Sequence, residues 1–579
     1  MSISDKFLKS HSVLCDSELD DSFIDKSKYQ YVVDKMPTVE LTKLSKDEFN
    51  DGILKLAEFD VSKIGNKSCG TIFHVDKESL KIPAVYDVLC EILLHVDTDE
   101  RLRAFSDITE NYYNKTLSKY DLTKDQFSTQ LRLFLPYAKF ERLYHSCKKE
   151  NIDDIQKSAL EVEECIQYPV LYREECYAIL KHIYKTKEAE LISFEAVPAQ
   201  DLPGNLGKYY KIKLTARNGT ETETHRLFAK IVDKDNPDLR EFSMVPFGKE
   251  QFFFETLLKK CEELGLEELT DVCPKCYFAG NDKLLFEDLS VDGYSSWNFH
   301  IPVSYNWLET TVKKLAKLHA MSIIFEEKLS EKTGKIVRLD EEFSEGVAEA
   351  AFLDREDIRS FRESYKKCVG EYILPRCLGE SEGGRLDTLK EKIYEASDRI
   401  YVLVQKSDKI RNVYSHGDMW GANVMYKEDQ ATRTSSAYLI DFQLTRYCSP
   451  SVDLMFLLYA NTDRTSRLKH VKDLIEVYYK ELTNILSSYE IDAGNIFTLE
   501  QLKDSCREAE PSIICTALMY GQFLLMPDEF KTEMMSDKVR SRKFFTGDRK
   551  DELEKIWYYD PFRTRVEGLI EDAIRIFDE

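Results

Sequence analysis

Short hydrophobic segments with the composition of β-strands occur only between about residues 170 and 290. Three of them, residues 189–197, 208–217 and 224–232, are rich in β-branched and aromatic side chains. The last two flank Asn218-Gly219, a residue pair typical of a two-residue hairpin turn. The pattern therefore predicts an antiparallel hairpin in this part of the chain.

The next segments alternate between helical and strand patterns. A helix is predicted to begin near Phe247, in "FGKEQFFFETLLKKCEEL". The following stretch, "CYFAGNDKLLFEDL", predicts a second hairpin with Asn281-Asp282 at its turn. Hairpins around a single helix indicate a small α+β lobe, which we place at residues 166–289.

Beyond residue 290 the spacing of hydrophobic residues is helical. In residues 307–329 they recur at intervals of three and four, and an acidic helical segment follows at 341–399. The longest apolar run, residues 513–526, is too short to span a bilayer and predicts a buried helix. We expect residues 290–579 to form a larger, mainly helical lobe.

Residues 1–165 contain a partial internal repeat and are expected to form a helical segment. Residues 87–113 align without a gap to residues 453–479, and eight of the 27 positions are identical. We interpret the first copy as a non-catalytic duplicate of part of the second lobe. Chance similarity between two amphipathic helices, a regulatory module and a join of neighbouring genes are alternative explanations.

The overall charge limits the classes of partner. The formal net charge is −23, which disfavours electrostatic binding to nucleic acid or to an anionic membrane. Fourteen cysteines without a signal-peptide pattern indicate reduced thiols in a cytoplasmic protein, which we expect to be a monomer. Cys273 and Cys276 have the spacing of half a zinc site, but no second pair follows, so we do not expect zinc there.

The main candidate chemistry lies in the stretch that begins "HGDMWGANVM" at His416. Asp418 follows a strand and a glycine, Asn423 comes five residues later, and Asp441 ends the apolar run "YLIDF". A carboxylate and an amide oxygen together suit Mg²⁺, and a further carboxylate beside them can accept a proton from a hydroxyl group. These are the requirements of phosphoryl transfer.

A phosphoryl-transfer site also needs a cation, and Lys230 is the candidate. It is the only charged residue in the apolar strand "LFAKIV", and Glu250 in the following helix is a possible partner. The turn "PGNLGKYY", with Gly204 and Gly207, can cover phosphates with backbone amides. Each signal alone is weak, because most strand lysines are structural and glycine-rich turns are common. The order of the elements along the chain is the stronger argument.

That order, with the motifs "FGKEQFFFE", "LLFEDL", "LAKLHA", "HGDMWGANVM" and "LIDFQLTRYCSPSVDLM", resembles the ecdysteroid kinase-like family of insects. This family belongs to the choline and aminoglycoside kinase branch of the protein-kinase-like fold, so the resemblance implies a bilobal α+β architecture. It also implies ATP and Mg²⁺ as cofactors. Asp418 would be the catalytic base, Asn423 and Asp441 would hold Mg²⁺, and Lys230, paired with Glu250, would bind phosphates.

The resemblance further implies an adenine site and reveals two departures. The "LLFEDL" segment would be the hinge between the lobes, with the backbone around Glu287 and Leu289 meeting adenine. Ala422 stands where family members often have a polar residue, and Gly207 stands about where they tend to have serine. Neither change removes a required ligand.

The acceptor is expected to be a small molecule. Only eight residues separate Asp441 from Pro450, which leaves no room for the activation segment with which a protein kinase holds a peptide. A helical insert between about residues 300 and 410 would bind the acceptor, and the resemblance favours an ecdysteroid, a related steroid or a xenobiotic alcohol. The alternative is a kinase-like binding module with weak or no catalysis.

Two further residues near the motif are interpreted as structural. His416 precedes Asp418 by two positions and is expected to shape the loop by hydrogen bonding rather than to act as a base. Asp453 has a counterpart in the amino-terminal repeat, Asp87, which lacks the other motif residues. We therefore expect Asp453 to support the fold.

Overall fold

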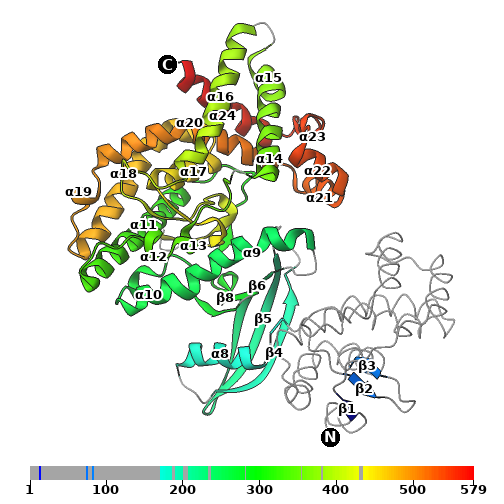
Figure 1. The fold of residues 1–579 in the computed structure, drawn as a ribbon, viewed down its shortest axis with the longest axis vertical. Coiled ribbons are helices and arrows are strands. Elements are labelled where there is room, and N and C mark those ends of the chain that lie inside the picture. Colours follow the sequence, from blue (N-terminus) through cyan, green and yellow to red (C-terminus); the bar gives the residue numbers. More distant parts are fainter. Residues whose placement is uncertain are drawn as a thin grey trace, which may run out of the picture. The chain divides into compact units, whose positions relative to one another are not determined.

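The computed structural model (Figure 1) describes residues 12–14, 73–75, 81–83, 170–171, 173–185, 189–199, 207–232, 237–280, 282–353, 355–379, 383–429 and 434–578. The chain forms two compact units, Met1–Val197 with Ile212–His225 and Pro198–Lys211 with Arg226–Glu579. The repeat predicted at residues 87–113 lies outside the described residues. The domain boundaries predicted at residues 165 and 289 stay predictions.

Among the described residues, the first unit contains three short strands, one helix and part of a larger sheet. The short strands pair antiparallel in the order β1-β2-β3. The elements are β1 (Ser12–Leu14), β2 (Phe73–Val75), β3 (Lys81–Pro83), α8 (Arg173–Tyr184) and β4 (Glu190–Pro198). Strand β4 therefore lies within one residue of its predicted position.

The larger sheet has the strand order β4-β5-β6-β8-β7. Its other strands are β5 (Gly207–Asn218), β6 (Glu221–Val232), β7 (Cys276–Ala279) and β8 (Lys283–Glu287). Both predicted hairpins are confirmed, and Gly219 in the first turn has a φ of 63°, which favours glycine. Residue 281, in the second turn, lies outside the described residues. The β6–β8 register places Lys230 opposite Leu284.

The helix that follows β6 is longer than the pattern predicts. It begins with α9 (Pro237–Phe252) and continues through the π-helical turn η4 (Phe253–Leu257) into α10 (Leu258–Glu263). The predicted start near Phe247 is therefore wrong by ten residues. Pro246 lies inside α9, although an internal proline usually marks a helix boundary because it lacks an N–H donor.

The rest of the second unit is mainly helical, as predicted. Its helices are α11 (Tyr305–Thr333), α12 (Leu339–Glu342), α13 (Ser344–Val347), α14 (Glu356–Cys368), α15 (Leu374–Leu378), α16 (Gly383–Leu403), α17 (Pro450–Asn461), α18 (Arg464–Ser488), α19 (Ala493–Ile496), α20 (Leu499–Leu524), α21 (Asp528–Ser536), α22 (Lys538–Thr546), α23 (Lys550–Ile556) and α24 (Asp560–Asp578). The acidic segment predicted to be helical at 341–399 contains the end of α12, all of α13 to α15 and most of α16.

Short strands and turns lie between these helices and carry much of the candidate site. The strands are β9 (Ser295–Ser296), β10 (Val413–Ser415), β11 (Val424–Asp429), β12 (Thr434–Leu439) and β13 (Arg446–Cys448). The short helical turns are η5 (Glu267–Leu269), η6 (Leu289–Asp292), η7 (Val369–Ile373), η8 (Gly421–Asn423) and η9 (Phe442–Leu444). Strand β10 pairs with β13, and β11 lies between β12 and β9.

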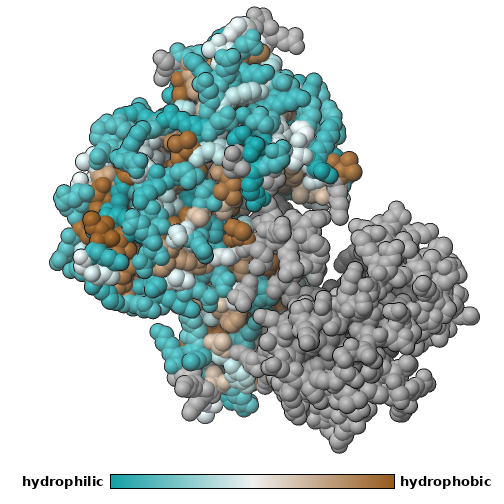
Figure 2. Space-filling view, in the orientation of Figure 1, coloured by the Kyte–Doolittle hydropathy of each residue, from teal (hydrophilic) through white to brown (hydrophobic). Residues whose placement is uncertain are grey.

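Helices α11, α17, α18 and α20 pack side by side and form the centre of the helical part (Figure 1). The apolar run predicted as a buried helix lies mostly within α20, where Ile513, Ile514 and Leu518 are fully buried. On the face drawn in Figure 2, the surface of the helical part is mainly hydrophilic, and its hydrophobic side chains lie in small separate areas. No helix of the described residues is long and apolar enough to cross a membrane.

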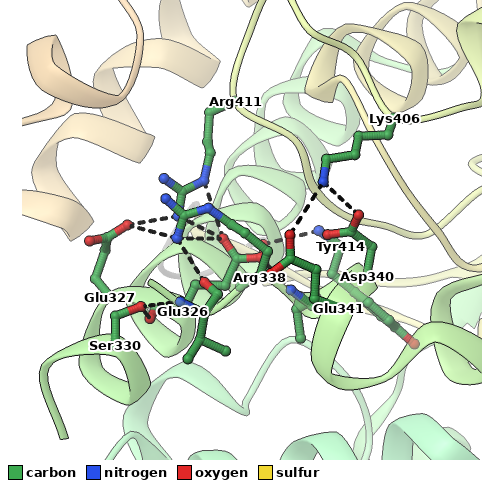
Figure 3. Close-up of polar contacts among 12 residues, drawn as sticks. Glu326, Glu327, Ser330, Arg338, Asp340, Glu341, Lys406, Arg411 and Tyr414 are labelled. Carbon is green, nitrogen blue, oxygen red and sulfur yellow. Dashed lines mark hydrogen bonds and ion pairs between the residues drawn. The ribbon is translucent and has the colours of Figure 1, made fainter. Parts of the chain in front are cut away.

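A buried ion pair anchors the segment that leads into β10 (Figure 3). Glu326 on α11 is 1% exposed, and one of its oxygens accepts hydrogen bonds from Arg411 at 2.6 and 3.2 Å. Its other oxygen accepts from the backbone N–H of Leu339 at 2.8 Å, and Arg411 also contacts Glu327 at 2.7 Å. The guanidinium therefore joins the chain just before β10 to α11 and, through Glu326, to the start of α12.

Removal of this guanidinium is expected to destabilise the protein strongly. In Arg411→Met the Glu326 carboxylate loses its main cationic partner while it stays buried, and the free energy of unfolding should fall by about 3–5 kcal/mol. Denaturant unfolding measures the change. The matched control is Arg507→Met, which removes an exposed guanidinium that contacts Glu500 and Asp504 and should have little effect. Equal stability of the two variants would contradict the anchoring role of Arg411.

Candidate active site

Lys230, on the central strand β6, lies between two carboxylates. Its Nζ is 2.6 Å from Glu250 Oε2 and 2.6 Å from Asp441 Oδ1. Lys230 and Glu250 are 5% and 1% exposed, whereas the Asp441 side chain is 31% exposed. Burial alone lowers the pKa of Lys230, but the two carboxylates outweigh this and raise the pKa above its usual value. The lysine is therefore firmly charged, and the predicted pairing with Glu250 is present.

The backbone at Asp441 holds its carboxylate in this position. Asp441 follows β12 and has a φ of 68°, a left-handed conformation that is uncommon for a non-glycine residue. The next residue is fixed on both sides: the Phe442 N–H donates to Glu250 Oε1 at 3.3 Å, and its ring stacks on Phe253 at 3.8 Å between centroids. Glu250 thus orients both Lys230 and the Asp441 turn.

Asp418 and Asn423 form the second half of the site. The Asn423 Nδ2 donates to Asp418 Oδ2 and to the Asp418 carbonyl oxygen, both at 2.9 Å. Asp418 Oδ1 is buried and has no hydrogen-bond partner among the described residues. Burial and the nearby Asp441 carboxylate raise the pKa of Asp418 from 3.8 to about 7. The structure therefore brings Asp418, Asn423 and Asp441 together, as the sequence predicts.

His416 connects the two loops that carry these aspartates. Its Nε2 contacts the Ile440 carbonyl oxygen at 2.9 Å, and its Nδ1 lies 3.3 Å from the backbone nitrogen of Asp418. Burial lowers the pKa of His416, so the ring is neutral; Nε2 then donates to Ile440, and Nδ1 accepts from Asp418. Both ring nitrogens are used within the loops, which supports the structural interpretation of His416.

Asp453, at the start of α17, fixes the backbone of the same loop. Its carboxylate accepts hydrogen bonds from the N–H groups of His416 at 2.5 Å and Gly417 at 3.0 Å. His319 Nε2 on α11 lies 3.4 Å from the same carboxylate, and its Nδ1 is 2.7 Å from the Tyr478 hydroxyl on α18. Asp453 is only 1% exposed, which fits a role in supporting the fold.

The donor groups at the site fit Mg²⁺. No group of three or more His, Cys, Asp or Glu residues able to hold a metal occurs among the described residues. Magnesium, however, typically takes one or two protein oxygens together with waters and phosphates. The Asp441 carboxylate and the Asn423 amide oxygen supply this set, because the Asn423 nitrogen makes both bonds to Asp418. A divalent cation there would also offset the repulsion between Asp418 and Asp441.

Of the other predicted site residues, Gly207 and Glu287 lie at strand ends of the sheet. Gly207 is the first residue of β5, and a Cβ at this position would lie 3.0 Å from the Ile231 carbonyl oxygen. Glu287 ends β8, three residues beyond the partner of Lys230, and its carboxylate accepts from the Lys275 N–H at 2.8 Å. Leu289 begins η6 and is buried. Gly204 lies outside the described residues.

Several residues near the site carry no clear sequence signal. Gln443, in the amide orientation that satisfies both contacts, donates to Asp441 Oδ1 at 3.1 Å and accepts from Lys230 Nζ at 3.2 Å. Its position two residues after Asp441 is the only local hint. Arg446 donates to the Gly417 carbonyl oxygen at 3.2 Å and pairs with Glu349 at 3.0 Å. The two partners of Arg446 are far from it in the sequence, so the spacing of residues does not predict these contacts.

Lys230, Asp418, Asn423 and Asp441 lie together, and only a short connection leads from Asp441 to α17. These features define the class of protein: a small-molecule phosphotransferase with an α+β, bilobal, protein-kinase-like fold. Residues 206–491 match the model of the ecdysteroid kinase-like family, and this part of the chain belongs to that family. The resemblance carried by the sequence motifs is therefore confirmed. Membership of this kinase family implies ATP as the phosphoryl donor.

Solved structures similar to this chain include two kinases of small alcohols. An ethanolamine kinase of Plasmodium vivax is 12% identical to this chain, with a TM-score of 0.33. The match covers 82% of this chain and 96% of the ethanolamine kinase chain. A choline kinase of Streptococcus pneumoniae is 13% identical, covers 69% of this chain and 98% of its own, and has a TM-score of 0.28. At these scores neither likeness bears on the acceptor. No curated protein sequence matches the chain.

The turn at Gly417 is expected to reject any side chain. Its φ is 83°, and a Cβ there would lie 1.9 Å from the Leu444 carbonyl oxygen. Gly417→Ala must therefore displace either the Asp418 loop or the turn after Asp441. The matched control is Gly334→Ala, where φ is 69° but no atom lies within 4 Å of the added Cβ.

Denaturant unfolding of the two glycine variants separates backbone strain from steric overlap. The Gly334→Ala variant should lose about 1 kcal/mol of unfolding free energy. The Gly417→Ala variant should lose about 1–3 kcal/mol more because of the added overlap. A loss at Gly417 no larger than that at Gly334 would mean that the loop accommodates a methyl group.

Proposed function

We propose that the protein transfers the γ-phosphoryl group of ATP to a hydroxyl group of an ecdysteroid, a related steroid or a xenobiotic alcohol. The observation that carries this proposal is the environment of Asp418. Its Oδ1 is buried without a partner, and the carboxylate lies close to Asp441, which is held by the firmly charged Lys230. Such an atom is suited to accept a hydrogen bond, and then a proton, from an acceptor hydroxyl.

Asp418 acts as the general base. An aspartate with an ordinary pKa is a weak base at neutral pH, whereas burial and Asp441 raise the pKa of Asp418 to about 7. Proton transfer is most efficient when the pKa of the base lies near the working pH. The hydrogen bond from Asn423 occupies Oδ2, which leaves Oδ1 as the atom that would accept from the hydroxyl.

Lys230, Asn423 and Asp441 bind the phosphate end of ATP. Lys230 supplies a fixed positive charge, because Glu250 holds its ammonium group next to Asp441. Asn423 and Asp441 would hold Mg²⁺, which neutralises charge on the transferring phosphoryl group when it is bound. Gly204 and Gly207 would let the backbone approach the phosphates, and the Glu287–Leu289 segment would meet adenine.

The short connection after Asp441 supports a small acceptor. Helix α17 begins at Pro450, so residues 442–449 form only one short turn and strand β13. A peptide acceptor would lack the platform that an activation segment provides in protein kinases. Helices between α11 and β10 would form part of the acceptor site. We further propose a cytoplasmic monomer, in line with nine free thiols among the described cysteines.

Two aspartate variants test these roles. Asp418→Asn should lower turnover by about 10²–10⁴-fold and largely keep ATP binding, because the proton acceptor is lost but the phosphate ligands remain. Asp441→Asn should weaken Mg²⁺–ATP binding itself. Titration calorimetry with Mg²⁺–ATP measures binding, and Asp551→Asn on α23 is the surface control. Equal losses of nucleotide binding in both site variants would refute the division of roles.

A mass-shift assay identifies the acceptor. Purified protein with Mg²⁺–ATP is incubated with a panel of ecdysteroids, other steroids and plant alcohols, and Asp418→Asn serves as the control. Gain of one phosphoryl group by a compound, absent in the variant, would establish the reaction and the acceptor class. Binding of ATP without transfer to any compound would favour a kinase-like binding module instead.

A further inference from the structure

Four aromatic side chains and one lysine form a continuous set beside Asp418. We call this set, Phe299, Trp420, Tyr520, Phe523 and Lys531, the Lys531 cluster. All five side chains are partly exposed, although the aromatic ones pack against the hydrophobic core. Partly exposed aromatic side chains next to a catalytic group are typical of a ligand-binding surface.

One arm of the cluster runs along the catalytic loop. Trp420 lies two residues after Asp418, and its backbone N–H donates to the Asp418 carbonyl oxygen at 3.0 Å. The indole packs edge-on against Phe299, with ring centroids 5.4 Å apart. Phe299 in turn lies under the Lys531 ammonium group, which is 4.9 Å from the ring centroid.

The second arm runs along α20 and meets the first at the same lysine. The Tyr520 ring packs edge-on against Phe456 of α17, with centroids 5.2 Å apart, and burial together with the nearby Asp418 carboxylate raises the pKa of its hydroxyl. Phe523 follows three residues later, on the same face of the helix, and its ring centroid is 5.4 Å from Lys531 Nζ. The Tyr520 hydroxyl makes no hydrogen bond within the described part of the chain. The two arms therefore both lead from Asp418 to Lys531.

Lys531 is a mostly buried cation with spare hydrogen-bonding capacity. Its side chain is 17% exposed, and its Nζ donates to the Leu524 carbonyl oxygen at 3.3 Å. The nearest carboxylate, Asp528, is 3.8 Å away, is 76% exposed and is shared with His300 at 3.4 Å. An ammonium group has three donors, so Lys531 has a donor available for a further oxygen atom.

We propose that the Lys531 cluster binds the acceptor: the aromatic side chains hold a flat apolar body, and Lys531 donates a hydrogen bond to an oxygen at the end remote from the phosphorylated hydroxyl. This inference rests on the proposed function, because it takes Asp418 as the site of the reacting hydroxyl. It adds that the acceptor is bifunctional, with a hydroxyl at one end and a carbonyl, hydroxyl or carboxylate oxygen at the other.

Three matched probes test the proposal. They are 2-(2-naphthyl)ethanol and its 6-hydroxymethyl and 6-carboxylate derivatives, which differ only at the remote end. Binding is followed by tryptophan fluorescence without ATP, and phosphorylation is followed by mass spectrometry with Mg²⁺–ATP. The oxygen-bearing probes should bind about 10–100-fold more tightly than the parent, as expected for a hydrogen bond to a charged donor. The relative affinities of the two derivatives show which oxygen is preferred.

The Lys531→Met variant should abolish this preference while binding of the parent probe stays within about twofold of wild type. Lys531→Arg, which keeps a cationic donor, should restore part of it. Lys543→Met, at an exposed lysine that pairs with Asp551 on the neighbouring helix, is the control and should leave the preference unchanged. Phe523→Leu should weaken all three probes alike, because it removes ring contact rather than the donor.

The outcomes separate this proposal from the proposed function. Phosphorylation of the probes without any preference, or with a preference that survives in Lys531→Met, would overturn the role of the cluster and leave the kinase assignment intact. A Lys531-dependent binding preference without phosphorylation would support the cluster and count against catalysis. Failure of all three probes to bind would overturn the cluster as a site for flat alcohols.

Discussion

The buried ion pair between Lys230 and Glu250 is the interaction on which the candidate active site depends. A lysine at the centre of an apolar strand is costly unless an opposite charge lies within hydrogen-bonding distance. Glu250 provides that charge from α9, and its second oxygen accepts the N–H of Phe442, so one carboxylate fixes both the cation and the Asp441 turn. Strand, helix and the Asp441 turn are thereby aligned by a single side chain.

The catalytic loop is supported in a similar way by Asp453. Two loop N–H groups and a buried histidine converge on this carboxylate. Hydrogen bonds to backbone groups fix a loop more firmly than contacts between flexible side chains do, and the positive φ of Gly417 allows the sharp turn that they require. The two carboxylates, Glu250 and Asp453, therefore hold the backbone at Phe442 and at His416-Gly417, next to the two candidate site aspartates.

Sequence patterns revealed the features that depend on local physics. The Asn218-Gly219 turn was predicted correctly, and the strand carrying Lys230 was predicted with the correct end and a start three residues too late, because hairpin turns and β-rich segments have local signatures. The start of α9 was missed because Pro246 lies inside the helix. The grouping of Asp418, Asn423 and Asp441 was predicted from motif spacing. Arg446 and Gln443 were not predicted, since their contacts depend on how distant segments pack.

The support of the Asp418 loop by Asp453 has a consequence for how the protein is made. Synthesis proceeds from the amino terminus, so the loop around Asp418 leaves the ribosome before the whole of α17 has emerged. Until α17 has emerged and packed against α11, the loop lacks the carboxylate that accepts its N–H groups. A nascent chain that already contains Lys230, Glu250, Asp418 and Asp441 is therefore not yet an enzyme, and competence for chemistry arrives late in its biosynthesis.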